Sequence, residues 1–202
     1  MSVSPSYSDD GVLDDTPALL EGLRNGERGA QERFFDRHVA DVERVLFRML
    51  GPDSEFEDLV HEAFIQSVVH IHTFRGDNAK TLRAWVRAVA TRTAGKRIRR
   101  RQVRRILSLQ PPESFVDIPN SVDPSVQAAL QQTYALLERI PAADRIPFLL
   151  RFLHGMSLNE VAETCEVSLS TAKRRIQRGR ERFLALAHDD PLLKIWLGTE
   201  EP

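Results

Sequence analysis

The chain has 202 residues, of which 42% are hydrophobic and 28% are charged. This is the composition of an ordinary globular protein, which excludes wholesale disorder and a fibrous chain, and the length fits one large domain or two small ones. No apolar run approaches the roughly 20 residues that a membrane-spanning helix needs, so no membrane insertion is expected. A single cysteine, Cys165, excludes an intramolecular disulfide framework. We therefore expect a protein of the reducing cytoplasm, without a signal peptide.

The formal net charge of −1 conceals a strong segregation of charge along the chain. Acidic residues gather in the first 62 positions, whereas residues 78–112 contain no acid and many arginines and lysines. A second basic cluster occupies residues 173–182. Such one-sided runs repel themselves unless a polyanion neutralises them, and the phosphate backbone of a nucleic acid is the most common polyanion.

Helical periodicity dominates the first half of the chain. Residues 1–15 are expected to be a disordered acidic lead. Thr16-Pro17 predicts a helix start, with the threonine as the cap, because its oxygen can accept from a free amide and proline has no amide to leave unpaired. The helix that carries Phe34 and Leu50 on its apolar stripe is predicted to end at Gly51-Pro52.

Two further helices complete the first predicted domain, which spans residues 16–105. One covers residues 53–70, with Asp53 or Ser54 as its cap, and the other runs from about Lys80 to Arg105. The apolar side of the second is supplied by residues such as Leu82 and Val86.

The pattern then changes at the predicted linker, residues 106–123, which contains three prolines and no helical period. Asp123-Pro124 predicts that a helix starts again, and residues 124–188 are expected to form a second domain, followed by a tail at 189–202. The fold class predicted from these patterns is all-α, with two small helical domains joined by a flexible linker.

The most specific segment of the second domain predicts a helix-turn-helix. Ser157 and Glu160 form a capping box for a short helix that ends at Thr164, and Ser168 caps the next helix. Glu166 lies in the turn, where glycine is frequent, and a positive φ there would cost glutamate on the order of 1 kcal/mol.

The second helix of such a motif lies in the major groove, where Arg and Lys can read guanine and Gln can read adenine. We expect its DNA-facing side to carry residues for base edges together with arginines for phosphates. The candidate residues are Ser170, Thr171, Lys173, Arg174, Arg175, Gln177 and Arg178, with Arg182 as a further phosphate contact.

At these residues the chain resembles a known family. The segment from Leu149 to Phe183 resembles region 4 of bacterial RNA polymerase sigma factors, which reads the −35 promoter element. EDLVHEAFIQSVV, starting at Glu57, resembles region 2.2, and the segment from Phe74 to Gln102 resembles regions 2.3–2.4, which bind and melt the −10 element. The two segments in this order are similar to the compact extracytoplasmic-function (ECF) group, and the resemblance covers most of residues 17–187.

The resemblance implies a sigma factor that binds core RNA polymerase, through the β′ coiled coil and the β flap, and promoter DNA. It also allows for an anti-sigma factor as a partner. The implied polymerase contacts are Glu57, Asp58, His61 and Glu62. The implied −10 residues are Phe74, Arg75, Lys80, Arg83, Arg87, Arg92, Lys96, Arg97, Arg99 and Arg100.

Two other functions remain open from the residues. One is a polymerase-independent helix-turn-helix repressor, which would bind a palindromic duplex by itself. The other is an adaptor whose basic stretches bind an acidic protein. The sequence contains no phosphate-binding glycine loop, no GxSxG and no paired carboxylates in an evident cleft, so we expect no enzymatic activity, no cofactor and no metal site.

Overall fold

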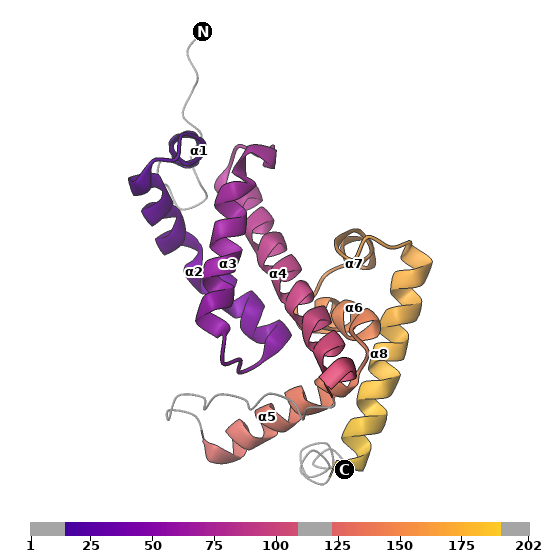
Figure 1. The fold of residues 1–202 in the computed structure, drawn as a ribbon. Coiled ribbons are helices and arrows are strands. Elements are labelled where there is room, and N and C mark those ends of the chain that lie inside the picture. The colour runs from indigo at the N-terminus through magenta and orange to yellow at the C-terminus, as the bar shows by residue number, and fades with distance from the viewer. Residues whose placement is uncertain (1–14, 109–122, 191–202) are drawn as a thin grey trace. The chain divides into compact units, whose positions relative to one another are not determined.

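The computed structural model describes residues 15–108 and 123–190, and within these ranges every regular element is a helix (Figure 1). The predicted all-α fold is confirmed. None of the described helices is both long enough and apolar enough to span a bilayer. The predicted tail after residue 190, most of the linker and most of the acidic lead lie outside the described residues. In chain order the helices are α1 (Thr16–Arg24), α2 (Arg28–Leu50), α3 (Phe56–Val69), the 3₁₀ helix η1 (Ile71–Thr73), α4 (Ala79–Ser108), α5 (Pro124–Arg139), α6 (Ala142–Phe152), α7 (Leu158–Thr164) and α8 (Leu169–Asp189).

The helix ends follow local signals in the sequence, with exceptions at α1 and α3. The predicted cap of α3 at Asp53 or Ser54 is wrong, because α3 begins only at Phe56, and Asp53 Oδ1 accepts from the Glu55 amide before the helix. The Asp123 carboxylate accepts from the Ser125 amide and caps α5 as predicted, and Gly51 takes a φ of 72° directly after α2. The predicted cap at Thr16 is wrong, because Thr16 is already the first residue of α1 and Asp15 precedes it as the N-cap. Asp15 makes no side-chain capping hydrogen bond in α1; its carboxylate instead pairs with Arg37 at 2.6 Å.

The chain divides into two compact units by its contacts. The first contains residues up to Val45 together with Glu57–Thr93, and the second contains Leu46–Phe56 together with the chain from Ala94 onward. Both α2 and α4 therefore contribute residues to each unit. The sequence-based domain limits, 16–105 and 124–188, follow chain continuity instead, and they stay a prediction.

The core of the first unit is built from apolar faces of α1 to α4. Phe34 of α2 is buried and meets the Phe64 ring of α3 edge-on, with 5.7 Å between the ring centroids. Leu82 and Val86 of α4 are fully buried, as their helical spacing predicts. His38 lies against Phe34 in this core, and its ring nitrogens have no hydrogen-bond partner among the described residues. Burial first, and then Arg37, lowers the pKa of His38 to about 4.

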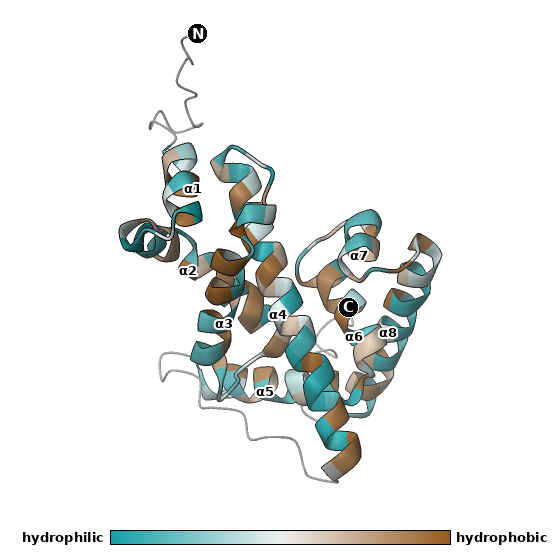
Figure 2. Cartoon of the chain, turned by 45° about the horizontal axis from the view of Figure 1, so that its top comes forward, coloured by the Kyte–Doolittle hydropathy of each residue, from teal (hydrophilic) through white to brown (hydrophobic). Residues whose placement is uncertain are grey.

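The core of the second unit is centred on α6 and α8. Leu149 and Leu150 of α6, Val161 of α7 and Ala172 of α8 are almost completely buried. Figure 2 shows brown apolar residues interrupting teal polar residues along α4 and α8, the pattern of amphipathic helices. Within the same unit, the Tyr134 hydroxyl of α5 donates to the carbonyl oxygens of Phe47 and Arg48 at the end of α2, at 2.9 and 3.0 Å.

Candidate nucleic-acid and partner interfaces

The helix-turn-helix is formed by α7 and α8, with the caps that the sequence predicts. Ser157 Oγ accepts from the Glu160 amide, and Glu160 Oε2 accepts from the Ser157 amide at 2.7 Å, which completes the capping box. Ser168 Oγ accepts from the Thr171 amide at the start of α8. Val161 and Ala162 of α7 are buried where the two helices meet.

The turn between α7 and α8 contains the backbone strain that the sequence suggests. Glu166 has a φ of 54°, in the left-handed region that favours glycine. The turn is closed by the Val167 amide, which donates to the Ala162 carbonyl at 3.0 Å. The positive φ of Glu166 therefore costs on the order of 1 kcal/mol of folding free energy, which the surrounding contacts offset.

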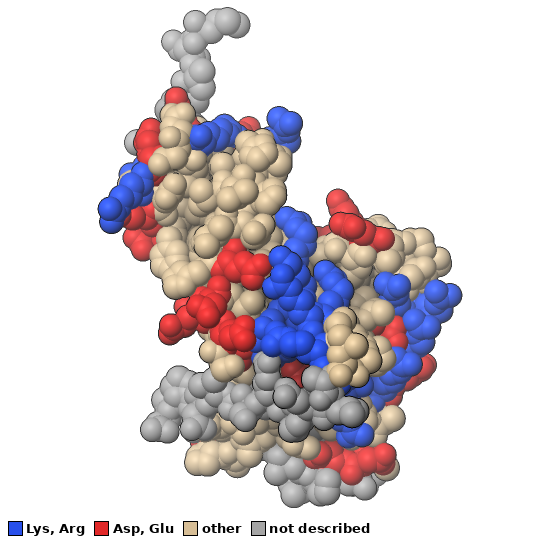
Figure 3. All heavy atoms as spheres, viewed as in Figure 1, with Lys and Arg blue, Asp and Glu red and all other residues tan. Residues whose placement is uncertain are grey.

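The outer side of α8 presents the predicted base-reading residues. Ser170, Lys173, Arg174 and Gln177 are exposed, whereas Thr171 and Arg175 are half-buried. On the face drawn in Figure 3, Lys and Arg side chains gather along α8 and over the C-terminal half of α4. Gln177 donates to Glu181, one turn later, at 2.8 Å. This exposed row has the donors and acceptors that base edges require, and its contact with bases stays a prediction.

The two remaining arginines on this side of α8 share one carboxylate that sequence reasoning missed. Arg178 Nη2 lies 2.9 Å from Asp144 Oδ1, and Arg182 Nη1 lies 2.5 Å from Asp144 Oδ2. Asp144 belongs to α6 and is buried, so α6 supplies an anionic contact to the predicted recognition helix.

The basic residues of α4 divide into an exposed set and a buried set. Arg97 is buried with only 5% of its side chain exposed, and Arg101 is exposed by 13%. Arg87 is half-buried. The predicted −10 residues of α4 that are exposed are Lys80, Arg83, Arg92, Lys96, Arg99 and Arg100. Burial therefore separates Arg97 from the other predicted DNA-binding cations of α4.

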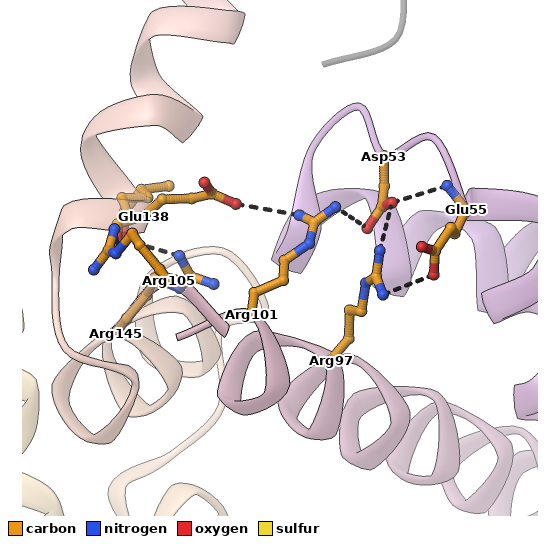
Figure 4. Close-up of polar contacts among 8 residues, drawn as sticks. Asp53, Glu55, Arg97, Arg101, Arg105, Glu138 and Arg145 are labelled. Atoms are coloured by element: carbon orange, nitrogen blue, oxygen red, sulfur yellow. Dashed lines mark hydrogen bonds and ion pairs between the residues drawn. The ribbon is translucent and has the colours of Figure 1, made fainter. Parts of the chain in front are cut away.

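Arg97 and Arg101 both contact the carboxylate of Asp53 (Figure 4). Its side chain is completely buried, and its Oδ2 lies 2.7 Å from Arg101 Nη2 while its Oδ1 lies 3.6 Å from Arg97 Nη2. Arg97 also pairs with Glu55 at 2.7 Å, and Arg101 also pairs with Glu138 of α5 at 3.2 Å. Two arginines that the sequence presents as part of a basic run thus form part of a buried ionic network.

The same network extends to α5 and α6 within the second unit. Arg105 donates to the Glu138 carbonyl at 2.6 Å, and Gln102 accepts from the Ala142 amide at 2.8 Å. Arg145 donates to the Leu137 carbonyl, and burial lowers its pKa to about 10 against the raising effect of Glu138. Carbonyl and carboxylate acceptors thus hold the guanidinium groups of Arg101, Arg105 and Arg145.

Arg83, near the start of α4, also has a carboxylate partner. Its guanidinium donates to both oxygens of Asp41 of α2, at 2.6 and 2.8 Å, and Arg44 adds a contact at 3.3 Å. The hydrogen bond from Arg83 lowers the pKa of Asp41 below its ordinary value. Arg83 is still 57% exposed, whereas the Asp41 side chain is only 9% exposed, so a buried carboxylate holds a guanidinium that reaches the surface.

Phe74 and Arg75, two predicted −10 residues in the loop before α4, differ in their exposure to solvent. Arg75 is exposed, whereas Phe74 is buried against Trp85, with 5.5 Å between the ring centroids. Gly76 lets the chain pass closely over this ring, since a Cβ there would lie 2.4 Å from Phe74 Cζ. In this structure the Phe74 ring belongs to the core of the first unit, and its predicted −10 role is untested.

The predicted polymerase contacts lie on α3. Glu57, Asp58 and His61 are exposed and Glu62 is half-buried, with the two acids of the first turn suitably placed for the helix dipole. Ile65 and Val69, which sequence reasoning assigned no role, are 60% and 57% exposed further along the helix. Their spacing of three and seven residues from Glu62 places them on the same side of α3, and this is the signal that could have identified them.

Comparison with known proteins assigns both halves of this chain. The model of Sigma-70 region 2 matches residues 34–104, and that of Sigma-70 region 4 matches residues 130–183. The chain is 26% identical over 172 residues to the ECF RNA polymerase sigma factor SigW of Bacillus subtilis, which covers 80% of this chain and 91% of that protein. It is 29% identical over 179 residues to the ECF RNA polymerase sigma-E factor of Escherichia coli, covering 81% and 89% of the two chains.

Solved structures support the same fold. CnrH, solved in complex with the cytosolic domain of CnrY, aligns with a TM-score of 0.56 at 19% identity, covering 88% of this chain and 99% of that one. The sigma factor RpoE of Bartonella quintana, solved in complex with the anti-sigma factor NepR, aligns with a TM-score of 0.57 at 20% identity, covering 79% and 97%. With the two matched regions in their order along the chain, these findings favour a sigma factor over the repressor that the sequence left open. The protein belongs to the sigma-70 family, in the ECF group of RNA polymerase sigma factors, and it directs the initiation of transcription.

Proposed function

We propose that three surfaces of the described residues divide the work of a sigma factor. The exposed side of α3, with Glu57, Asp58, His61 and Glu62, binds the β′ coiled coil of core RNA polymerase. The exposed basic residues of α4 hold the −10 region, and α8 reads the −35 element. The observation that carries this proposal is the presence of two basic helices, α4 and α8, one in each matched sigma region.

The docking role of α3 rests on its charge and exposure. Acidic side chains repel phosphate, so a protein surface is the partner that fits them. Ile65 and Val69 extend this side with apolar area, which a protein partner can bury and a DNA backbone cannot. We include both residues in the docking surface, and we assign the β flap to the second unit.

The −10 role of α4 rests on the exposed cations. Single-stranded DNA is held by backbone charge and by base stacking. Lys80, Arg92, Lys96, Arg99 and Arg100 can supply the charge, together with Arg75 in the preceding loop. Arg97 is excluded from this surface as long as Asp53 and Glu55 hold it.

The −35 role of α8 rests on the helix-turn-helix geometry. Lys173, Arg174 and Gln177 occupy the N-terminal half of the exposed side, the part of a recognition helix that reaches base edges in the major groove. Arg175, Arg178 and Arg182 lie beside them and fit phosphate groups.

An anti-sigma factor is a further partner that we propose, because the solved relatives CnrH and RpoE are each bound to another protein, CnrY and NepR respectively. We also propose that the protein works in the cytoplasm and has no enzymatic activity of its own. Burial raises the pKa of the Cys165 thiol, which disfavours the thiolate that a cysteine nucleophile needs.

Run-off transcription tests the proposal. The full chain is mixed with core RNA polymerase and a library of promoter fragments, and the transcribed templates are sequenced. We expect transcripts from a subset that shares a −35 and a −10 element, and little binding of the same DNA by the protein alone. Tight binding of a palindromic duplex without polymerase would contradict the proposal and restore the repressor.

Lys173→Ala tests the assignment of α8 in the same assay. The variant should lose preference at one position of the −35 element, by about 1–3 kcal/mol, and leave the −10 preference unchanged. Arg180→Ala, an exposed cation on the same helix outside the predicted base-reading set, is the matched control. An equal loss for all −35 sequences would make Lys173 a phosphate contact instead.

A further inference from the structure

Two arginines of α8 meet a single carboxylate of α6. Arg178 donates from Nε and Nη2 to Asp144 Oδ1, at 3.2 and 2.9 Å, and Arg182 donates from Nη1 to Asp144 Oδ2. The Asp144 side chain is only 4% exposed, whereas the two arginine side chains are 44% and 47% exposed. The acceptor is thus fixed inside the protein while the two guanidinium groups extend to its surface.

Gly179 brings the two helices close enough for this arrangement. A Cβ at Gly179 would lie 2.7 Å from the Asp144 carbonyl oxygen and 2.7 Å from Phe148 Cβ. Gly179 lies between Arg178 and Arg182 in the sequence, so the closest approach of α6 and α8 coincides with the ion pairs. The close packing of α6 against α8 therefore fixes the backbone positions of Arg178 and Arg182 relative to Asp144.

The contacts leave part of each guanidinium available. An arginine has five N–H donors in a planar fork. Asp144 engages Nε and Nη2 of Arg178, and Nη1 of Arg182, so Nη1 of Arg178 and Nη2 of Arg182 lie outside these hydrogen bonds. A guanidinium held along one edge can still donate to a phosphate oxygen along the other.

The position of Arg178 and Arg182 on α8 also fits contacts with phosphate groups. Arg174, Arg178 and Arg182 follow one another at intervals of four residues, so they form a continuous row on the helix surface. This row starts among the exposed residues that we assign to base edges and turns gradually toward α6. Its later members therefore border the predicted groove contact, where the DNA backbone lies.

We propose that Asp144 is a positioning residue that orients Arg178 and Arg182 toward phosphate groups flanking the −35 element. This inference rests on the proposed function of α8. Asp144 touches no DNA in this account; it acts through the two arginines by reducing the rotamer freedom that each would lose on binding.

A carboxylate so close to DNA-binding cations has two other conceivable effects, and each predicts a different result. If Asp144 only neutralised the arginines, its removal would free positive charge and tighten DNA binding. If it only tied α6 to α8, its removal would lower stability and leave the affinity of the folded protein unchanged. A positioning role alone predicts weaker binding that affects every DNA sequence equally.

The test uses the full chain assembled with core RNA polymerase. Fluorescence anisotropy measures its binding to a labelled promoter duplex obtained from the run-off selection, and to the same duplex with scrambled −35 bases, over a range of NaCl concentrations. Asp144→Asn keeps the shape of the side chain and removes its charge. Asp189→Asn removes the same charge from an exposed position of α8 and is the matched control.

We expect Asp144→Asn to bind both duplexes about 3- to 10-fold more weakly, with a salt slope shallower by about 0.9 for each phosphate group that the arginines no longer neutralise. Asp144→Glu should restore part of the affinity, and Asp189→Asn should behave as the unsubstituted protein does. Tighter binding, unchanged binding, or a weakening confined to the unscrambled duplex would overturn the inference.

A second variant keeps the test decisive if Asp144→Asn does not fold, which circular dichroism would reveal. Arg182→Gln leaves Asp144 paired with Arg178 and should by itself make the salt slope shallower by about 0.9; an unchanged slope would overturn the inference. If the unsubstituted holoenzyme did not distinguish the two duplexes, the proposed function of α8 would fail and the inference with it. Discrimination together with an unaffected Asp144→Asn would overturn the inference alone.

Discussion

The basic helices α4 and α8 carry similar charge and use it in different ways. In the second half of α4, Arg97 is buried and Arg101 is 13% exposed, and both pair with Asp53, which is itself inaccessible to solvent. On α8, Arg178 and Arg182 also share a buried aspartate, but their own side chains remain about half exposed. A buried carboxylate with two arginines is thus part of the protein interior at α4, whereas at α8 it holds two arginines that remain accessible at the surface.

The difference shows that a count of basic residues overstates the DNA-binding charge of a helix. A guanidinium buried with its carboxylate cannot reach a phosphate, whereas a half-exposed one keeps donors for it. The comparison also predicts which substitutions affect stability and which affect binding. Substitutions at Asp53, the buried carboxylate that pairs with α4, should act mainly on the free energy of unfolding.

The largest effect is expected for Asp53→Ala. Removing this carboxylate takes from Arg97 and Arg101 the buried acceptor that they share, while Glu55 still pairs with Arg97 and Glu138 with Arg101. Loss of one partner from a buried ionic network typically costs about 3–5 kcal/mol. Urea denaturation followed by circular dichroism should show the free energy of unfolding reduced by an amount in this range.

Glu57→Ala is the matched control for Asp53→Ala. It removes an acid four residues later, at an exposed position of the first turn of α3. Its effect should remain within about 0.5–1 kcal/mol, the contribution of one acid to the helix dipole. Equal effects of the two substitutions would refute the buried character of the Asp53 network and with it the contrast between α4 and α8.

A smaller effect, on the order of 3 kcal/mol, is expected from the titration of His38. Its pKa is about 4 in the folded protein and 6.5 in an ordinary environment, so the unfolded chain takes up the proton first. The free energy of unfolding should therefore fall as the pH decreases from about 6.5 to about 4. Asp41, whose pKa is lowered by the hydrogen bond from Arg83, should reduce stability only below that window.

His38→Leu separates these contributions. The slope of stability against pH between 6.5 and 4 should become shallower, whatever the variant does to stability at neutral pH, while the decrease at lower pH should remain. His61→Ala, at an exposed position of α3, should preserve the slope. If the slope survived in His38→Leu, groups other than His38 would have to account for it, and its assignment to His38 would be wrong.

The sequence was most informative where local chemistry decides the structure. The capping box of Ser157 and Glu160 and the cap at Ser168 depend on neighbours within a few residues, and both were predicted. The turn position of Glu166, where glycine is frequent, has a positive φ. The order of the two sigma-like segments was equally readable, and it identified the family. The cap of α1 was misplaced by one residue because Asp15 and Thr16 are both acceptable N-cap residues.

The pairing of arginines with distant carboxylates was not predicted. Asp144 lies 34 residues from Arg178, and Asp53 lies even further from Arg97, so no local pattern joins them. A weaker signal was present on α4, where Ala90, Ala94, Arg97 and Arg101 follow the spacing of a single helix face. Because Arg97 and Arg101 continue the buried face of Ala90 and Ala94, their spacing indicates that they are turned toward the interior. Reading the segment by its charge alone missed this signal.

The smallest of these effects, about 1–2 kcal/mol, is expected for Gly179→Ala. The new methyl group would lie 2.7 Å from a backbone oxygen of α6, which cannot rotate away, so α6 and α8 must separate. Overpacking of this kind costs about 1–3 kcal/mol, and the better helix propensity of alanine offsets about 0.5–1 kcal/mol of it. Thermal unfolding should show the net destabilisation.

Gly29→Ala provides the control for this last substitution, because it makes the same change in α2, where the nearest atom to the added Cβ is the mobile Arg33 Nη1 at 3.7 Å. There the higher helix propensity of alanine should appear by itself, as a stabilisation of at most about 0.5–1 kcal/mol, because Gly29 is the second residue of α2 and this figure applies to a helix interior. Opposite signs for the two substitutions would show that close approach, and not glycine flexibility, sets the distance between α6 and α8. A stabilised Gly179→Ala would mean that α6 and α8 can move apart without loss of stability. The close packing at Gly179 would then not be what fixes the geometry of Asp144 with its two arginines.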